Sequence, residues 1–312
     1  DIKQRDFDKL LLKRNQALAN GVLISAEDDF VKATISDSNS SQKVRIRLKG
    51  DWTDHLQSNK WSYRVKLRGD ETFLGMSKFS LQSPGTRNYI WEWFYHKLLE
   101  NEGLPTIRYF FKPLIVNGNN LGIYAIEEHF DKILIESNNF KEGPILKLSE
   151  DVYWMKKFDK TKLGKNDDES FIKSYSSGFK LNKIRKSEEQ KNNFVIANQL
   201  LNGIHSEVLS TSNVFDIDLL AKFFAINDLV GSYHARAWHN HRFYFDPIQS
   251  KLIPIGFDAD ANKVPLENLS IAHKRPWIKT LFKDLEFVKK YTSSLEEISE
   301  KDYLDSFLSK NK

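Results

Sequence analysis

The order of apolar and polar residues changes several times along the chain, and each change predicts an element. Apolar residues recur near helical spacing over residues 5–20, which predicts a helix there. Residues 22–85 are strand-rich, and within them the segments 44–49 and 63–68 alternate strictly between apolar and basic side chains. Strict alternation is typical of strands with one buried face, so we expect both segments to be such strands.

A helix and a hairpin are predicted next. Residues 88–101 carry apolar side chains on one helical face, which predicts a helix. The turn Asn117-Gly118-Asn119-Asn120 separates two apolar-rich segments, 109–116 and 121–126, and this pattern is typical of a β-hairpin. A short helix is expected at about 130–137.

The later part of the chain is predicted to be mainly helical. We expect helices at about 189–203 and 216–230, a second hairpin over 242–255, and a helical tail that begins near Pro276. Residues 158–190 are rich in Lys, Asp, Glu and Ser and have few apolar residues. Such a composition favours a mobile loop or an irregular insertion.

Strands in the first part and helices in the second predict an α+β fold with two lobes. We expect a single domain over residues 1–312, with a strand-rich N-lobe at about 20–128 and a helix-rich C-lobe at about 129–312. A chain of 312 residues suits one two-lobed unit of this kind.

Composition excludes several classes of protein. The chain is 40% hydrophobic and 29% charged, which is an ordinary globular balance. The net charge of +5 comes from scattered residues, so we expect weak attraction to anions and no nucleic-acid partner. The absence of Cys excludes disulfides and thiolate metal sites, and no apolar run reaches the ~20 residues of a membrane span. We expect an exported or cell-envelope protein of a bacterium, with any leader or anchor outside this sequence.

The two alternating strands carry the first candidate site. Alternation places Arg45, Arg47 and Lys49 on one face, and it does the same for Arg64 and Lys66. If the strands pair, the guanidinium and ammonium groups form one basic face that suits phosphate oxygens. The alternative is an ordinary solvated face.

Two acidic residues and a glycine-led loop are weaker candidates. Glu127 and Glu128 are adjacent on a strand, so their side chains point to opposite faces, and one could face a cleft and the other solvent. The alternative is an ordinary junction between a strand and a helix. The loop Gly50 to His55 could bring backbone N–H groups to a phosphate, or it could simply satisfy its own polar groups. It matches neither the Walker pattern nor the Gly-x-Gly-x-x-Gly pattern.

The second hairpin carries the most informative candidates. Asn240 precedes its first strand and Asp258 follows its second strand, so these two side chains can converge at one end, and Asp260 lies two residues after Asp258. Amide and carboxylate oxygens suit Mg²⁺ that also binds nucleotide phosphates. The alternative is that Asn and Asp occur here as ordinary turn residues. Three histidines lie within 234–241, but no His-Glu-x-x-His helix accompanies them, which argues against zinc.

The chain resembles the CotH kinase family, a group of atypical kinases named for a spore-coat protein. The resemblance covers about residues 40–262 and rests on short segments in the family's order. These segments are Arg47-Leu48-Lys49-Gly50, Lys60 to Leu67, Thr86-Arg87, Val116-Asn117-Gly118, Leu121 to Tyr124, Glu127-Glu128, His239-Asn240, and Pro254 with Phe257-Asp258.

The resemblance implies an atypical protein-kinase-like fold that binds ATP with Mg²⁺ or Mn²⁺. The expected reaction is phosphate transfer to a hydroxyl group of protein Ser/Thr or of a carbohydrate. The resemblance implies that Asn240 and Asp258 are metal ligands and that Lys60 or Lys66 contacts the nucleotide phosphates. It also implies that the segment with Glu127 and Glu128 meets adenine between the lobes.

The chain departs from the family at the catalytic base. Family members usually carry an Asp shortly before the His-Asn pair, whereas this chain has Gly231 or His234 there, depending on the alignment. Three readings follow: His234 is the base, Asp228 is the base, or the protein is not a protein kinase. Imidazole is a credible base because its usual pKa is near neutral.

Two other functions compete with phosphate transfer. A non-catalytic, pseudokinase-like module would bind nucleotide, polyphosphate or an acidic glycan through the basic face without turnover. A metal-dependent nuclease fits least well, because the acidic residues gather around one hairpin.

Overall fold

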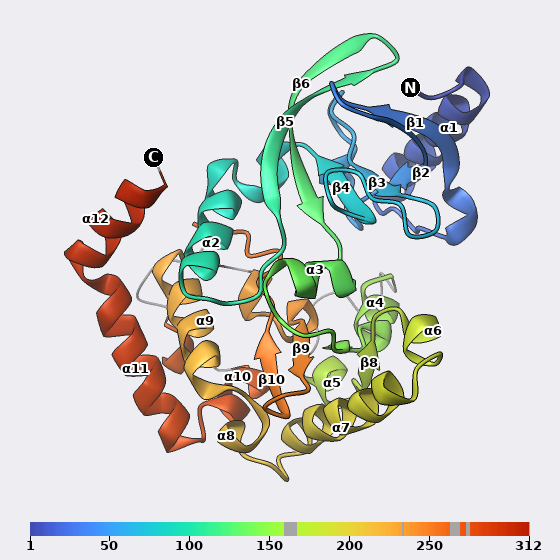
Figure 1. Cartoon of the computed structure of the whole chain (residues 1–312). Helices are drawn as coiled ribbons and strands as arrows, with labels where there is room; N and C mark the ends of the chain where they lie inside the picture. The colour runs from blue at the N-terminus through green and yellow to red at the C-terminus, as the bar shows by residue number, and fades with distance from the viewer. Residues whose placement is uncertain (159–166, 233, 263–268, 273–274, 312) are drawn as a thin grey trace. The chain divides into compact units, whose positions relative to one another are not determined.

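The structure, a computed structural model, describes residues 1–158, 167–232, 234–262, 269–272 and 275–311 (Figure 1). The chain divides into two compact units. Unit 1 contains residues 1–93 and 107–134, and unit 2 contains residues 94–106 and 135–312. No described helix is both long enough and apolar enough to cross a membrane.

Unit 1 is built on an antiparallel sheet of six strands in the order β1-β2-β3-β4-β6-β5. Its elements are α1 (Gln4–Asn20), β1 (Val31–Ser36), β2 (Ser41–Leu48), β3 (Tyr63–Lys66), β4 (Lys78–Gln82), β5 (Tyr109–Val116) and β6 (Asn119–Glu128). Helix α1 contributes Leu10 and Ala17 to the apolar core that the sheet forms. The helix ends at Gly21, whose φ of 76° is left-handed and whose N–H donates to the carbonyl oxygen of Ala17.

The two alternating segments pair with each other. Strands β2 and β3 place Arg45 opposite Lys66 and Arg47 opposite Arg64. The apolar residues between them are buried, for example Val65, which is fully enclosed. The predicted basic face is therefore confirmed. Its positive side chains lie directly opposite one another on the two strands, and this arrangement is unfavourable unless acidic side chains or bound anions compensate the charge.

Unit 2 is a mainly helical unit around a small antiparallel sheet with the order β10-β9-β7-β8. Its sheet consists of β7 (Ile145–Leu148), β8 (Ser176–Gly178), β9 (Phe243–Asp246) and β10 (Lys251–Pro254). Its helices are α4 (Asp151–Phe158), α5 (Asp167–Ile172), α6 (Leu181–Ile184), α7 (Glu188–His205), α8 (Thr211–Val214), α9 (Ile217–Leu229), α10 (Pro276–Leu281), α11 (Leu285–Ser299) and α12 (Lys301–Lys310).

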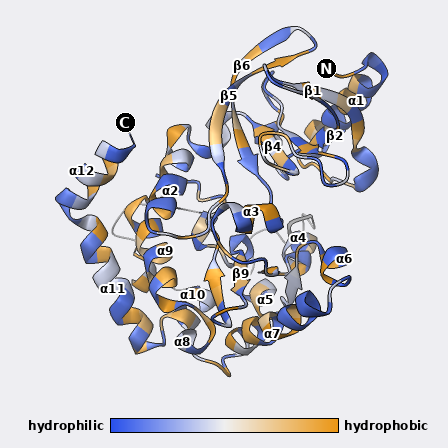
Figure 2. Ribbon diagram, viewed as in Figure 1, coloured by the Kyte–Doolittle hydropathy of each residue, from blue (hydrophilic) through white to orange (hydrophobic). Residues whose placement is uncertain are grey.

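Helix α9 is largely buried within unit 2. Its residues from Phe223 to Asp228 are all buried, which is typical of a central helix. Figure 2 shows hydrophobic residues along β9 and β10, whereas the outer helices α11 and α12 mix both kinds. The buried side chains of Phe243 and Leu252 join α9 in one core.

Helices α2 (Ile90–Asn101) and α3 (Lys132–Ser137) each contribute residues to both units. The second part of α2 belongs to unit 2, because Tyr95, Leu98 and Leu99 are buried in its core. The expected division at about residue 128 places these residues in the first lobe, and the structure differs from it here.

Most predicted elements are confirmed, but the charged stretch 158–190 differs from the expected irregular loop. Within it, residues 167–190 form α5, β8, α6 and the start of α7. Apolar residues at wide spacing hold these short elements in place, since Phe171 is 5% exposed and Ile184 is 9% exposed. Residues 159–166 lie outside the described residues.

Candidate functional site

Candidate functional side chains form one group in each unit. The group in unit 1 lies on the basic face of the sheet and is centred on Glu127. The group in unit 2 lies at the end of the β9–β10 hairpin and contains Asn240 and Asp258.

In unit 1, a buried lysine and a buried glutamate form the centre of the group. The Lys49 ammonium donates to both carboxylate oxygens of Glu127, at 2.9 Å and 3.0 Å, and also to the amide oxygen of Gln82. The Gln82 amide and the Ser80 hydroxyl donate to the same carboxylate, at 3.0 Å and 3.2 Å. The carboxylate is thus fixed by several donors, and it orients Lys49 in turn.

Further cations surround this pair. Burial lowers the pKa of Lys49, Glu127 opposes that effect, and nearby Arg64 and Arg87 lower the pKa further. Burial also lowers the pKa of Arg64 to about 10, against the opposing effect of Glu127. We call Lys49, Arg64, Ser80, Gln82, Arg87 and Glu127 the Glu127 cluster. Lys49 and Arg64 both lie near the buried Glu127 carboxylate, and Arg87 lies near Lys49, so this set of cations suits a bound anion.

Other predicted residues of unit 1 lie outside this cluster. Lys66 pairs with Glu27 at 3.2 Å, and its ammonium lies 5.6 Å from the centre of the Phe30 ring. Arg47 lies over the same ring at 5.4 Å. Lys60 donates to a backbone carbonyl at the surface and lines a separate pocket.

Glu128 is held in place by the backbone and side chain of Arg108. Its carboxylate accepts from the backbone N–H of Arg108 at 3.1 Å and from Nε and Nη2 of the Arg108 guanidinium. The adjacent acids do point to opposite faces, as expected. The expectation that one of them faces solvent was wrong, because Glu127 and Glu128 are each 2% exposed. A bidentate Arg is the reason that Glu128 can be buried.

The loop from Gly50 to His55 is closed on itself. Gly50 has a φ of 109°, and a Cβ atom there would lie 2.5 Å from the ring of His55. The His55 Nδ1 atom lies 2.9 Å from the hydroxyl of Ser62, and the backbone of Ser62 donates to His55. These contacts favour the reading in which the loop satisfies its own polar groups.

In unit 2, Asn240, Asp258 and His234 form a compact polar group. The Asn240 amide lies 3.4 Å from the Asp258 carboxylate, and His234 Nδ1 lies 3.4 Å from the same oxygen. The expected convergence of Asn240 and Asp258 is therefore confirmed. The antiparallel pairing of β9 with β10 brings them together, because one precedes the first strand and the other follows the second.

The backbone after β10 is strained. Asp258, Asp260 and Asn262 have φ values of 49°, 46° and 60°, all in the left-handed region. Hydrogen bonds hold the segment, since Ala259 accepts from the N–H of His234 and Asn262 donates to Val230. Asp and Asn tolerate this conformation better than most residues. Strain of this kind is often found at functional sites.

The donor set fits a hard divalent cation. Asp258 supplies a carboxylate. Asn240 supplies an amide oxygen if its side-chain amide flips, which exchanges the positions of its nitrogen and oxygen. Among the described residues, no three His, Asp or Glu side chains are placed to hold a metal ion. A cation held by Asn240 and Asp258 would therefore share oxygens from phosphate and water, as Mg²⁺ commonly does. Asp260 is half-buried two residues further on.

Asp228, the other candidate base, is fully enclosed. Its carboxylate accepts from Arg236 at 2.8 Å, from the backbone and hydroxyl of Ser270 at 2.9 Å and 2.8 Å, and from the hydroxyl of Tyr291. Burial raises its pKa, and Arg236 opposes that effect. The hydrogen bond from Tyr291 joins α11 to α9, so Asp228 has a structural role in unit 2.

Several polar residues of these groups were not predicted. Ser80 and Gln82 alternate with Phe79 and Leu81 on β4, so the period-2 pattern that identified the neighbouring strands could also have found them. Glu150 pairs with the buried Arg242 at 3.2 Å. It is 92 residues away in the sequence, and no local pattern links the two.

A comparison with known families gives one match. The family described as CotH kinase protein matches residues 46–310, which is most of the chain and includes Lys49, Glu127, Asn240 and Asp258. No curated protein matches the chain. The family resemblance drawn from short motifs is confirmed, and so is the mixed α+β, kinase-like fold.

Proposed function

The chain belongs to the CotH kinase family, and we propose that it is an ATP- and divalent-metal-dependent phosphotransferase acting on a hydroxyl acceptor. The family suggests a kinase-like phosphotransferase in general. The proposed use of ATP rests mainly on the Glu127 cluster, in which Glu127 orients a buried Lys49 among further cations. Such an arrangement suits the phosphates of a nucleotide.

The residues of the two units have different tasks in this proposal. Lys49 and Arg64 contact phosphate oxygens, and Glu127 holds Lys49 in position. Asn240 and Asp258 hold Mg²⁺ or Mn²⁺, with Asp260 nearby. When bound, the cation would neutralise negative charge on the phosphates. Lys60 and Lys66 have no role in this proposal, because Lys60 donates to a backbone carbonyl and Lys66 pairs with Glu27.

We propose that His234 accepts the proton of the acceptor hydroxyl. Its Nδ1 atom lies 3.4 Å from Asp258, so the carboxylate can orient the ring. Asp228 fits this task less well, because Arg236, Ser270 and Tyr291 surround its carboxylate. The acceptor hydroxyl would belong to a protein or a carbohydrate.

One observation favours a second candidate, a non-catalytic module that binds nucleotide, polyphosphate or an acidic glycan. The acid that could replace the family's usual base, Asp228, is engaged by its neighbours. A module of this kind needs only the cations of the Glu127 cluster.

Two measurements separate these proposals. The first is the melting temperature of the full chain with ATP, with and without Mn²⁺, for the parent and for Asp258→Asn. Nucleotide binding without any metal dependence would sink the phosphotransferase proposal. The second is release of ADP and phosphate incorporation measured by mass spectrometry. Tight, metal-dependent binding without turnover, even with a panel of protein and glycan acceptors, would favour the non-catalytic module.

A further inference from the structure

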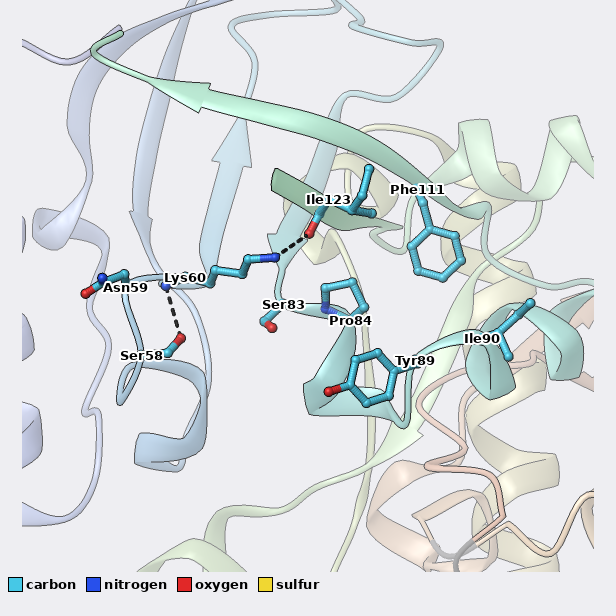
Figure 3. Close-up of a pocket in the computed structure, with 9 residues that line it drawn as sticks. All are labelled: Ser58, Asn59, Lys60, Ser83, Pro84, Tyr89, Ile90, Phe111 and Ile123. Atoms are coloured by element: carbon cyan, nitrogen blue, oxygen red, sulfur yellow. Dashed lines mark hydrogen bonds between the residues drawn. The ribbon is translucent and has the colours of Figure 1, made fainter. Parts of the chain in front are cut away.

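Unit 1 contains a surface pocket of about 730 Å³ that the proposed phosphate transfer does not use (Figure 3). Three parts of the chain form it: residues 58–60, residues 83, 84, 89 and 90, and the strands β5 and β6 through Phe111 and Ile123. All of them belong to unit 1. The volume lies within the range of ~300–1,000 Å³ that is usual for small-molecule sites.

Large apolar side chains surround this pocket and remain open to solvent. Tyr89 is 67% exposed, Ile90 is 59% exposed and Ile123 is 49% exposed. Figure 3 shows Tyr89, Ile90, Phe111 and Ile123 around one hollow, with Pro84 beside them. Exposed apolar groups that gather in one place often mark a binding site.

One positive charge lies in this apolar setting. Lys60 is the one charged residue among the described residues that line the pocket. Its ammonium donates to the carbonyl oxygen of Ile123 at 3.2 Å and lies 5.9 Å from the centre of the Tyr124 ring. Within the described part of the chain, no carboxylate pairs with it. An ammonium has three donors, so Lys60 can donate to a ligand as well.

The aromatic ring of Tyr89 is placed by a strained turn. Asn88 and Tyr89 have consecutive left-handed φ values of 51° and 58°. The turn is held by the N–H of Tyr89, which donates to Pro84 at 2.9 Å, and the Tyr89 ring lies against Gly85. A left-handed tyrosine is unfavourable, and Tyr89 belongs to neither hydrophobic core formed by the described residues. Backbone strain at a largely exposed side chain is a reason to look for function.

We propose that this pocket binds a small amphipathic monoanion, namely a flat ring that carries one carboxylate. The ring would contact Tyr89, Phe111 and Ile123, and the carboxylate would accept from Lys60. One ammonium matches one negative charge, whereas a nucleotide carries several and fits the Glu127 cluster better. The site is separate from the proposed phosphate transfer and does not depend on it.

The test uses two probes that differ only in charge, 3-phenylpropanoate and its neutral amide. Their dissociation constants for the full chain are measured by saturation-transfer NMR. We expect the acid to bind at least tenfold more tightly than the amide. Lys60→Met should remove this preference, and Lys60→Arg should retain most of it. Lys112→Met, which removes an exposed cation from the same sheet, should change nothing.

The variant Tyr89→Gly distinguishes a role of Tyr89 in ligand binding from a role in the stability of the fold. Glycine accepts a φ of 58° without strain, so the variant should melt at a higher temperature while losing affinity for both probes. Equal binding of acid and amide, or unchanged binding by Lys60→Met, would overturn the proposal. Displacement of the acid by ATP would also overturn it, because the pocket would then belong to the nucleotide site. Acid binding that persists in Asp258→Asn would support a separate site.

Discussion

The Lys49 ammonium lies 2.9 Å and 3.0 Å from the two carboxylate oxygens of Glu127, and the glutamate side chain is 3% exposed. One ammonium group thus contacts both oxygens of a buried acid. The geometry fixes the position of the lysine more firmly than a surface ion pair would. Arg64 and Arg87 lie nearby, so several cations gather beside the pair, and guanidinium groups of this kind suit phosphate oxygens.

Lys49→Met should weaken ATP binding at least about tenfold, because a charge-assisted contact contributes roughly 1.5–3 kcal/mol. It should also destabilise the fold by about 3 kcal/mol, because Glu127 loses its main partner. Isothermal titration and chemical denaturation measure the two effects. The double variant Lys49→Met/Glu127→Gln should recover stability but not affinity. Recovery of both would contradict a direct phosphate contact.

Asp258→Asn should abolish the metal-dependent part of nucleotide binding and lower turnover by two or more orders of magnitude. Asparagine has nearly the same shape and tolerates the φ of 49° found at this position, so the melting temperature should change little. The control is Asp216→Asn, the same change at the N-cap of α9, where asparagine also caps well. Equal effects of Mn²⁺ on the parent and Asp258→Asn would rule out the assigned role.

The free energy of unfolding of Asp228→Asn should be lower than that of the parent by about 3 kcal/mol, because the buried Arg236 loses its charged partner. His234→Gln should lower kcat with only a small change in stability, since His234 is about one-third exposed. Asp218→Asn, which removes a surface acid from the same helix, should cost less than about 0.5 kcal/mol. An Asp228→Asn protein of normal stability that has lost all turnover would instead identify Asp228 as the base.

Acid should destabilise the protein partly through His241. Burial lowers the pKa of His241 from 6.5 to about 3, and the ring accepts from Trp277 and donates to Ala235, each at 2.7 Å. The unfolded state therefore binds a proton that the folded state does not. This contribution is complete above pH 6.5 and is lost as the pH falls toward 3, by at most about 1.4 kcal/mol per pH unit.

Denaturation of His241→Asn at several pH values isolates this effect. Asparagine can replace the acceptor for Trp277 but cannot be protonated in this range. The variant should be less stable at pH 7, yet its free energy of unfolding should depend less on pH between 6.5 and 4. Parallel pH curves for the parent and the variant would refute the assignment.

Local patterns were sufficient to predict most of the fold. The alternation in 44–49 and 63–68 predicted both strands and their basic face, because period-2 patterning reflects burial directly. The same reasoning brought Asn240 and Asp258 to one end of the β9–β10 hairpin. The turn Asn117-Gly118 likewise marked the β5–β6 hairpin.

Long-range polar partners could not be predicted in this way. Lys49 and Glu127 are 78 residues apart, and which face of each strand meets the other depends on the order β2-β3-β4-β6 in the sheet. Asp228 was a reasonable candidate base by spacing alone. Only the packing of α9 against α11 reveals Tyr291 as one of its partners. The roles assigned to the site residues stay predictions.

The left-handed residues at 258, 260 and 262 have a consequence for how this segment tolerates substitution. In a saturation library sorted for protein abundance, all three positions should accept chiefly Gly, Asn and Asp, because the backbone alone imposes that choice. Sorting the same library for activity should leave position 262 as permissive as before and reduce position 258 to Asp. The two sorts would thereby separate what the main chain demands from what the chemistry demands, at neighbouring positions that look alike in sequence.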